Sequence, residues 1–316
     1  MIYKHYLKKL FFVSIFFLVF NFSKAYTDNQ ITIVAKINNE IVTNIDVEKE
    51  TRYLLALNPG LRTISKDKLK KIAKKSIIKE KIKKIEVSKF FEIDKQNEYF
   101  GQVFRDFYIG LNINSEKDLE KYLSEYKLKV DDVKKKINIE TLWNELIYLK
   151  FKNQIDIDEV KMKKKLKKKL SKDETQQSYL LYEIIFSSEN KDDLKKKHEI
   201  IKKSINEIGF QKTANIYSES DSSTRDGKIG WINESQLSGL IKKELTEIKI
   251  GEYTNLISVT GGSLILTIKD KKNIKNNLNF EEEFKKTLSF ERNRQLNQFS
   301  TIYFSKIKNN VNIYEK

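Results

Sequence analysis

The sequence predicts an α+β fold in which a mostly helical domain, built from both ends of the chain, carries one smaller α/β domain. Two observations lead to this prediction. Apolar residues recur at helical spacing between about residues 46 and 171 and again between 280 and 307, whereas residues 176–274 mix strand-like stretches with helices. Because the last helix cannot bury its apolar face alone, we expect residues 275–316 to pack back on the N-terminal helices.

The first 25 residues have the pattern of a secretory signal peptide. Basic residues precede the apolar run LFFVSIFFLVFNF, and Ser23 and Ala25 place small side chains at the two positions that a signal peptidase reads. We expect cleavage after Ala25, export of the remainder, and no stable membrane insertion afterwards. A membrane anchor is the alternative, but the apolar run is shorter than the ~20 residues that cross a bilayer.

Residues 26–175 are predicted to form the helical domain. Apolar and polar residues alternate on both sides of Asn38-Asn39, which predicts a hairpin over 31–47. The first helix is expected to end at Pro59, the only proline of the chain. Ser115 and Asp118 have the spacing of a capping box. Helices are predicted at about 46–57, 65–91, 95–110, 115–126, 130–151 and 156–171.

Residues 176–274 are predicted to form the α/β domain, whose length of about one hundred residues is common for a domain. Its expected elements are a strand at 178–186, a helix at 191–208, a glycine-containing turn near 227–230, a helix at 237–245 and a strand in SLILTIKD. A long amphipathic helix at 280–307 follows the domain.

The formal net charge of +17 would suit an anionic partner such as nucleic acid. However, Met162, Leu166 and Leu170 recur every four residues in VKMKKKLKKKL, which makes the surrounding lysines the solvated sides of one helix. No base-stacking aromatic residues interleave with these lysines. We therefore expect no nucleic-acid partner, and steeply salt-dependent DNA binding would be needed to support one.

The chain contains no cysteine and two histidines, of which only His198 lies beyond the predicted signal peptide. This composition excludes thiol catalysis, leaves no multi-histidine metal site, and leaves no catalytic triad unless it uses His198, which is expected to be solvated. The phosphate-binding and dinucleotide-binding glycine patterns are also absent. We therefore expect no cofactor and no metal.

Two glycines and a tryptophan, Gly227, Gly230 and Trp231, form the distinctive turn DGKIGW. With the residues before it, GFQKTANIYSESDSSTRDGKIGW, this turn resembles the pattern of parvulin-type (PpiC-type) peptidyl-prolyl isomerases. The resemblance continues through Leu237 and Gly251 to TGGSLILTIKD. In addition, VAKINNEIVTNIDV resembles the N-terminal signature of the SurA-type periplasmic chaperones. The Trp231 ring either packs the turn on the sheet or contacts a peptide.

The resemblance implies two activities. SurA-type chaperones bind unfolded polypeptides, outer-membrane proteins in particular, in the periplasm, and parvulins accelerate rotation about Xaa-Pro bonds. Parvulins place one histidine on the first strand of the domain and another on the last. Here the matching positions are Glu183 and Leu264. Chaperone binding without catalysis is therefore the first interpretation, and an active prolyl isomerase is the alternative.

The resemblance also implies a peptide site. The residues of the family's proline slot correspond to Leu237 and Ile241, and Ser263 stands beside Leu264 where the family has phenylalanine. We expect these four residues to bind peptide. Glu183 is the candidate catalytic residue, because its carboxylate can orient the twisted amide. The alternative for Glu183 is a charge at the edge of the sheet that faces water.

Overall fold

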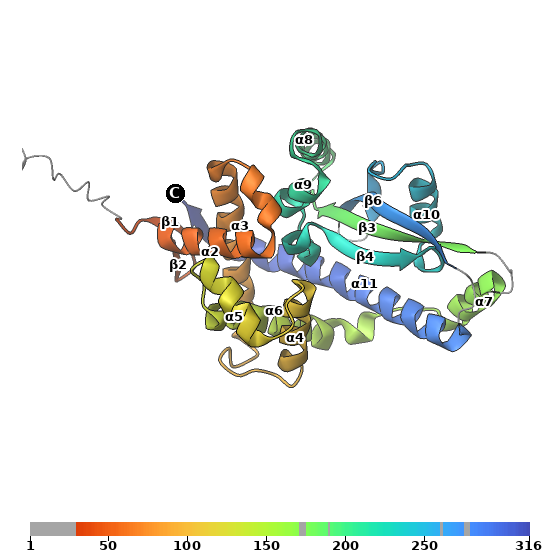
Figure 1. Cartoon of the computed structure of the whole chain (residues 1–316), viewed down its shortest axis with the longest axis horizontal. Coiled ribbons are helices and arrows are strands. Elements are labelled where there is room, and N and C mark those ends of the chain that lie inside the picture. The colour runs from red at the N-terminus through yellow and green to blue at the C-terminus, as the bar shows by residue number, and fades with distance from the viewer. Residues whose placement is uncertain (1–29, 171–174, 189, 260–261, 275–278) are drawn as a thin grey trace, which may run out of the picture. The chain divides into compact units, whose positions relative to one another are not determined.

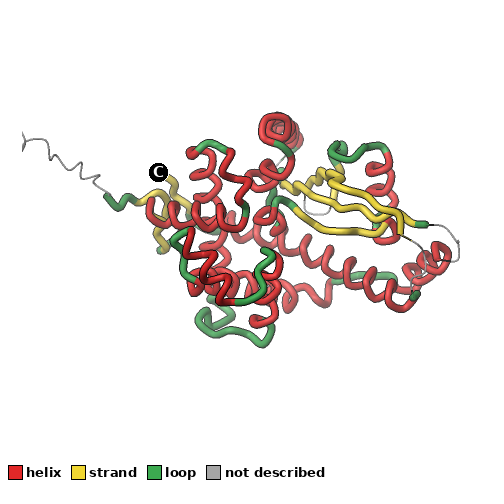
Figure 2. Tube along the Cα trace, in the orientation of Figure 1, coloured by secondary structure: helices red, strands yellow, loops and turns green. Residues whose placement is uncertain are grey.

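The computed structural model describes residues 30–170, 175–188, 190–259, 262–274 and 279–316. The predicted signal peptide and its cleavage site lie outside the described residues. From Ile33 to Lys316 the chain forms one compact unit, in which helices predominate and two small sheets are present (Figure 2). The predicted α+β fold class is confirmed.

The first sheet contains strands from the beginning and from the end of this chain segment. Strands β1 (Ile33–Ile37) and β2 (Glu40–Thr43) form the predicted hairpin, in which Asn38 takes a positive φ of 50°. On its other side β1 pairs with β7 (Ile313–Glu315), so the strand order is β2-β1-β7. Strand β7 is not predictable from the sequence, because three residues show too little alternation to indicate a strand.

Six helices follow the hairpin, and they occur close to the predicted ranges. Thr43 caps the first of them, because its side chain accepts from the Asp46 main chain while the Asp46 side chain accepts from the Thr43 main chain. Ser115 caps a later helix in the same position as predicted, accepting from the Asp118 main chain. The helices are α2 (Asn44–Leu57), α3 (Lys66–Val87), α4 (Phe100–Gly110), α5 (Glu116–Glu125), α6 (Val130–Phe151) and α7 (Glu159–Leu170).

Helices α2, α3 and α6 are held together by a charged cluster as well as by apolar packing. The Lys136 ammonium on α6 lies 2.6 Å from the Glu50 carboxylate on α2 and also contacts Glu80 on α3. These neighbouring carboxylates raise the pKa of Lys136 against the effect of its burial. Glu50 is buried and Lys136 is partly buried, so removing Lys136 would leave the buried Glu50 carboxylate without its counter-charge.

The second sheet belongs to the α/β part. Strand order is β4-β3-β6-β5, and every pair is antiparallel. Its elements are β3 (Gln176–Phe186), α8 (Lys191–Ile208), α9 (Phe210–Tyr217), β4 (Lys228–Asn233), α10 (Gly239–Thr246), β5 (Ile257–Val259) and β6 (Gly262–Ile274). The short helix α9 was not predicted, and it is separated from α8 only by Gly209 at a φ of 85°.

The last helix, α11 (Phe280–Asn309), contacts both parts of the compact unit (Figure 1). The indole Nε1 of Trp143 on α6 donates to Ser300 Oγ on α11 at 2.9 Å. Near the start of α11, the Glu283 carboxylate accepts from Asn233 and Ser235 of the α/β part at 3.1 and 3.0 Å. Among the described residues, no helix combines the length and the apolar composition that a membrane crossing requires.

Candidate functional site

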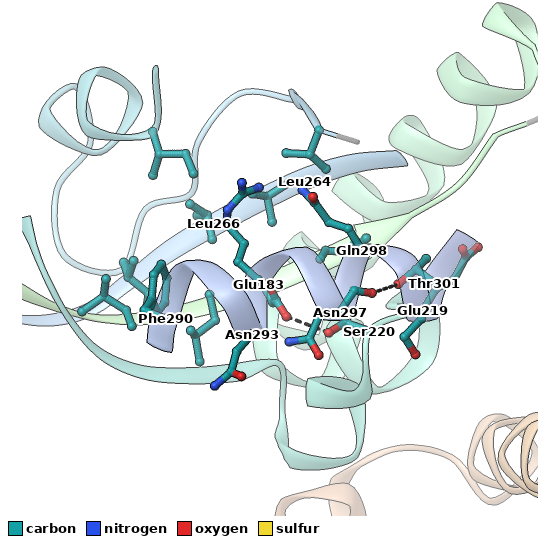
Figure 3. Close-up of a pocket in the computed structure, with 18 of the residues that line it drawn as sticks. Glu183, Glu219, Ser220, Leu264, Leu266, Phe290, Asn293, Asn297, Gln298 and Thr301 are labelled. Atoms are coloured by element: carbon teal, nitrogen blue, oxygen red, sulfur yellow. Dashed lines mark hydrogen bonds between the residues drawn. The ribbon is translucent and has the colours of Figure 1, made fainter. Parts of the chain in front are cut away.

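A pocket of about 320 Å³ lies between one face of the second sheet and α11 (Figure 3). This volume is near the lower end of the range of about 300–1,000 Å³ that is usual for ligand sites. Apart from Glu183, the sheet side of the pocket is apolar, since it is lined by Leu181, Ile185, Ile229, Ile232, Val259, Leu264 and Leu266. Such a wall can bury an apolar side chain without leaving buried polar atoms unpaired.

The predicted slot residues Leu237 and Ile241 line this pocket together with Leu264. Ser238 fixes the start of α10, the helix that carries Ile241, because its side chain accepts from the Ile241 main-chain N–H at 3.2 Å. Ser263, the fourth residue of the predicted peptide site, does not line the pocket. Successive side chains of β6 point to opposite faces of the sheet, and Leu264 and Leu266 occupy the pocket face.

Glu183 also lines the pocket, at the end where the polar residues gather (Figure 3). Its Oε1 accepts from Ser220 Oγ at 2.7 Å and from Ser222 Oγ at 2.9 Å. Strand β3 is an interior strand and the Glu183 side chain is half-buried. The interpretation of Glu183 as a water-facing charge at the sheet edge is therefore wrong. Its catalytic role stays a prediction.

The glycine turn supports the strand that carries Glu183. Gly227 has a φ of 75°, and its carbonyl accepts from the Glu183 main-chain N–H at 2.7 Å. A Cβ at this position would lie 2.3 Å from the Glu183 carbonyl oxygen, so only glycine permits this approach. Trp231 lies on β4 outside the pocket, 40% exposed, with the Lys272 ammonium 4.2 Å from its ring centroid.

The wall of the pocket opposite the sheet, which consists mainly of α11, was not predicted from the sequence. Its pocket-lining residues are Phe290, Asn293, Arg294, Asn297, Gln298, Ser300, Thr301 and Phe304. The sequence does not single out this face, because polar residues occupy most positions of the helix. Lys79 and Lys83 of α3 complete the polar end.

The turn next to Glu183 is also bound to the helical part. Asp226, at a positive φ of 62°, accepts through Oδ1 from Asn215 Nδ2 at 2.9 Å and from Asn58 Nδ2. Burial raises the pKa of the Asp226 carboxyl group above its ordinary value, and the hydrogen bond from Asn58 opposes part of this increase. The folded protein therefore binds this proton more tightly than the unfolded chain does.

We expect Asp226→Asn to be at least as stable as the wild type at pH 7. Because the Asp226 pKa is raised on folding, its contribution to stability falls as the pH rises from 3.8 through the raised value, and the loss persists above it. Asparagine keeps the Oδ1 acceptor and tolerates positive φ. In urea unfolding from pH 3.5 to 7, the free energy of unfolding of this variant relative to the wild type should rise with pH, with exposed Asp94→Asn as the control. Lower stability of Asp226→Asn at pH 7 would contradict the prediction.

In the described part of the chain, no other constellation of catalytic type is evident. Among the residues that the structure describes, no group of three or more histidine, cysteine, aspartate or glutamate side chains could hold a metal ion. His198 lies on α8 and does not line the pocket. The pocket next to Glu183 is therefore the candidate functional site.

A four-stranded antiparallel sheet with a slot over one face and helices α8 and α9 on its other side is a parvulin-like domain. In agreement with this fold, residues 176–270 match the family model of the Rotamase domain, described as the PPIC-type PPIase domain. This part of the chain is therefore a PpiC-type domain, which confirms the parvulin-like domain predicted from the sequence. The matched residues end before α11 begins.

Three solved structures illustrate what the chain is similar to. A PpiC-type peptidyl-prolyl cis-trans isomerase domain is 25% identical over 31% of this chain and 93% of its own, with a TM-score of 0.28. The peptidylprolyl isomerase PrsA of Bacillus anthracis is 15% identical over 76% and 98%, with a TM-score of 0.30. A SurA-like chaperone structure from Campylobacter jejuni is 15% identical over 90% and 99%, with a TM-score of 0.37. No curated protein matches the sequence of this chain.

Proposed function

We propose that this protein is an exported chaperone of the periplasm that binds unfolded polypeptides, outer-membrane proteins among them, and uses its PpiC-type domain to hold extended segments. The observation that carries this proposal is the pocket with an apolar wall formed by Leu237, Ile241 and Leu264. Both positions that carry a histidine in parvulins, Glu183 and Leu264, lack one here. The site therefore keeps the means to bind an apolar residue while the family's histidines are gone.

Binding would depend mainly on burial of an apolar side chain, proline included, against the sheet. Such burial contributes roughly 25 cal/mol per Å² and requires no cofactor. A pocket of this size suits an extended polypeptide rather than a folded domain, because a folded protein has few side chains that protrude far enough to enter the pocket. The N-terminal segment with the pattern of a signal peptide supports the periplasmic location.

We expect the double variant Leu237→Ala and Ile241→Ala to bind a blocked Ala-Leu-Pro-Phe peptide roughly thirtyfold more weakly than the wild type. Loss of these two contacts should cost about 2 kcal/mol of binding free energy. NMR titration of the peptide with the protein measures this change. Leu240→Ala is the matched control, because Leu240 lies next to Ile241 on α10, is 54% exposed, and does not line the pocket. Equal binding by the double variant and the wild type would refute the proposed site.

An active prolyl isomerase is the second candidate, and the position of Glu183 favours it. Two serine hydroxyls orient the Glu183 carboxylate at the polar end of an apolar pocket. A fixed acceptor in such a place can stabilise an amide whose resonance is lost in the twisted state. In the same NMR samples, cis/trans exchange peaks that disappear in Glu183→Gln while binding persists would support catalysis. Binding by the wild type without exchange would leave a chaperone that is not an enzyme.

A further inference from the structure

The α11 wall of the pocket lies outside the residues that match the PpiC-type domain, so it is a feature of the whole chain. Asn293, Asn297 and Thr301 follow one another at intervals of four residues and therefore share one face of the helix. Phe290 and Phe304 lie at the two ends of this row (Figure 3 shows Phe290 and the polar residues). The pocket thus has an apolar sheet wall and a polar helix wall.

The carboxamide side chains of the polar wall differ from that of the neighbouring Gln295 in their hydrogen bonding. Within the described residues, the side-chain amides of Asn293, Asn297 and Gln298 form no hydrogen bond to the protein. Gln295, which does not line the pocket, uses both ends of its carboxamide. It donates to the Asp156 carbonyl at 2.7 Å and accepts from the Asp156 N–H at 3.0 Å.

The contact between Gln295 and Asp156 shows what a carboxamide on α11 can bind. Asp156 lies in residues 155–158, which have no regular secondary structure. Its main-chain donor and acceptor are both satisfied by one side chain, since a carboxamide carries an N–H donor and a carbonyl acceptor. A peptide segment that enters the pocket has the same unpaired groups and must satisfy them when water is excluded.

We propose that Asn293 and Asn297 bind the main chain of an extended polypeptide segment whose apolar side chain occupies the slot formed by Leu237, Ile241 and Leu264. This inference rests on the proposed function and defines its ligand. The ligand is an unfolded segment with free peptide N–H and C=O groups beside a proline or another apolar residue. Recognition of the main chain accepts many sequences, as a chaperone requires. Asn293 and Asn297 are then binding residues contributed by the helical part.

The test compares the full chain with its double variant Asn293→Ala and Asn297→Ala. Both positions are exposed on a helix, where alanine favours the helical state, so the variant should fold. We expect its Kd for the blocked Ala-Leu-Pro-Phe peptide to be about tenfold higher, since two net hydrogen bonds are lost. Asn309→Ala is the control, because Asn309 is an exposed asparagine of α11 outside the pocket.

A second set of peptides, in which the Ala-Leu amide or the Pro-Phe amide is replaced in turn by an ester, identifies the main-chain contact, because the Leu-Pro amide itself carries no N–H. One of these esters should weaken binding to the wild type and have little further effect on the double variant, because the two changes remove the same hydrogen bond. Effects that add for every ester would overturn main-chain recognition. Tighter binding by the double variant would also overturn main-chain recognition, because it would show that the two asparagine side chains hinder entry of the peptide.

The outcomes for this inference and for the proposed function are distinguishable. If Leu237→Ala with Ile241→Ala weakens binding while Asn293→Ala with Asn297→Ala leaves it unchanged, the slot stands and the role of α11 is refuted. If the wild type does not bind the peptide, both proposals are refuted.

Discussion

Replacing Trp143 by alanine is expected to lower the free energy of unfolding by about 3–5 kcal/mol, the usual cost of removing a large buried aromatic side chain. Trp143 is 0% exposed, and its ring lies 5.8 Å from that of Tyr303 and 6.2 Å from that of Phe304 on α11. Its Nε1 donates to Ser300 at 2.9 Å, and the Lys83 ammonium of α3 lies 5.3 Å from the ring centroid. Helices α3, α6 and α11 therefore meet at this one side chain.

Urea unfolding monitored by far-UV circular dichroism measures the Trp143→Ala effect, and Trp231→Ala provides a matched control. Trp231 is 40% exposed, so the same chemical change should cost roughly 1 kcal/mol. We also expect Trp143→Ala to weaken peptide binding, because α11 supplies one wall of the pocket. A loss of stability no larger than that of Trp231→Ala would show that the packing of α6 against α11 contributes little to the free energy of unfolding.

Much of the fold could be predicted from the sequence because most helices bury one face. Apolar periodicity indicated α2 to α8, α10 and α11, and the capping residue Ser115 placed the start of α5. The ends were less well determined. Helix α3 was expected to reach Phe91 but ends at Val87, and α4 begins at Phe100 rather than at residue 95. Periodicity does not report the hydrogen bonds that end a helix.

The parts that could not be predicted depend on contacts between distant residues. Strand β7 is defined by its pairing with β1, which lies nearly 300 residues earlier in the sequence, and Tyr314 of β7 lies opposite Lys36 of β1. In the site, Glu183, Leu237, Ile241 and Leu264 were singled out and do line one pocket. Asn293 and Asn297 were not, because nothing local to α11 indicates which of its faces meets the sheet. Ser263 was expected in the peptide site because it stands where the family has phenylalanine, but it does not line the pocket.

Gly227→Ala is expected to lower the free energy of unfolding of the region around β3 by about 3 kcal/mol or more. A left-handed conformation costs a residue with a Cβ about 1–2 kcal/mol, and overpacking typically adds 1–3 kcal/mol. Both apply here, since φ is 75° and the added Cβ would lie 2.3 Å from the Glu183 carbonyl oxygen and 2.8 Å from the Ala214 Cβ. The first of these contacts is a main-chain atom that cannot rotate away.

Gly230→Ala separates the two causes. Gly230 has a φ of 110°, but a Cβ there would have nothing within 4 Å, so this variant reports backbone strain without a clash. We expect it to be clearly less damaging than Gly227→Ala in chemical unfolding. Hydrogen exchange at the Glu183 amide should also accelerate only in Gly227→Ala, because that N–H donates to the Gly227 carbonyl at 2.7 Å. If the two variants lose equal stability, the close approach of the turn to β3 does not hold Glu183 in the pocket.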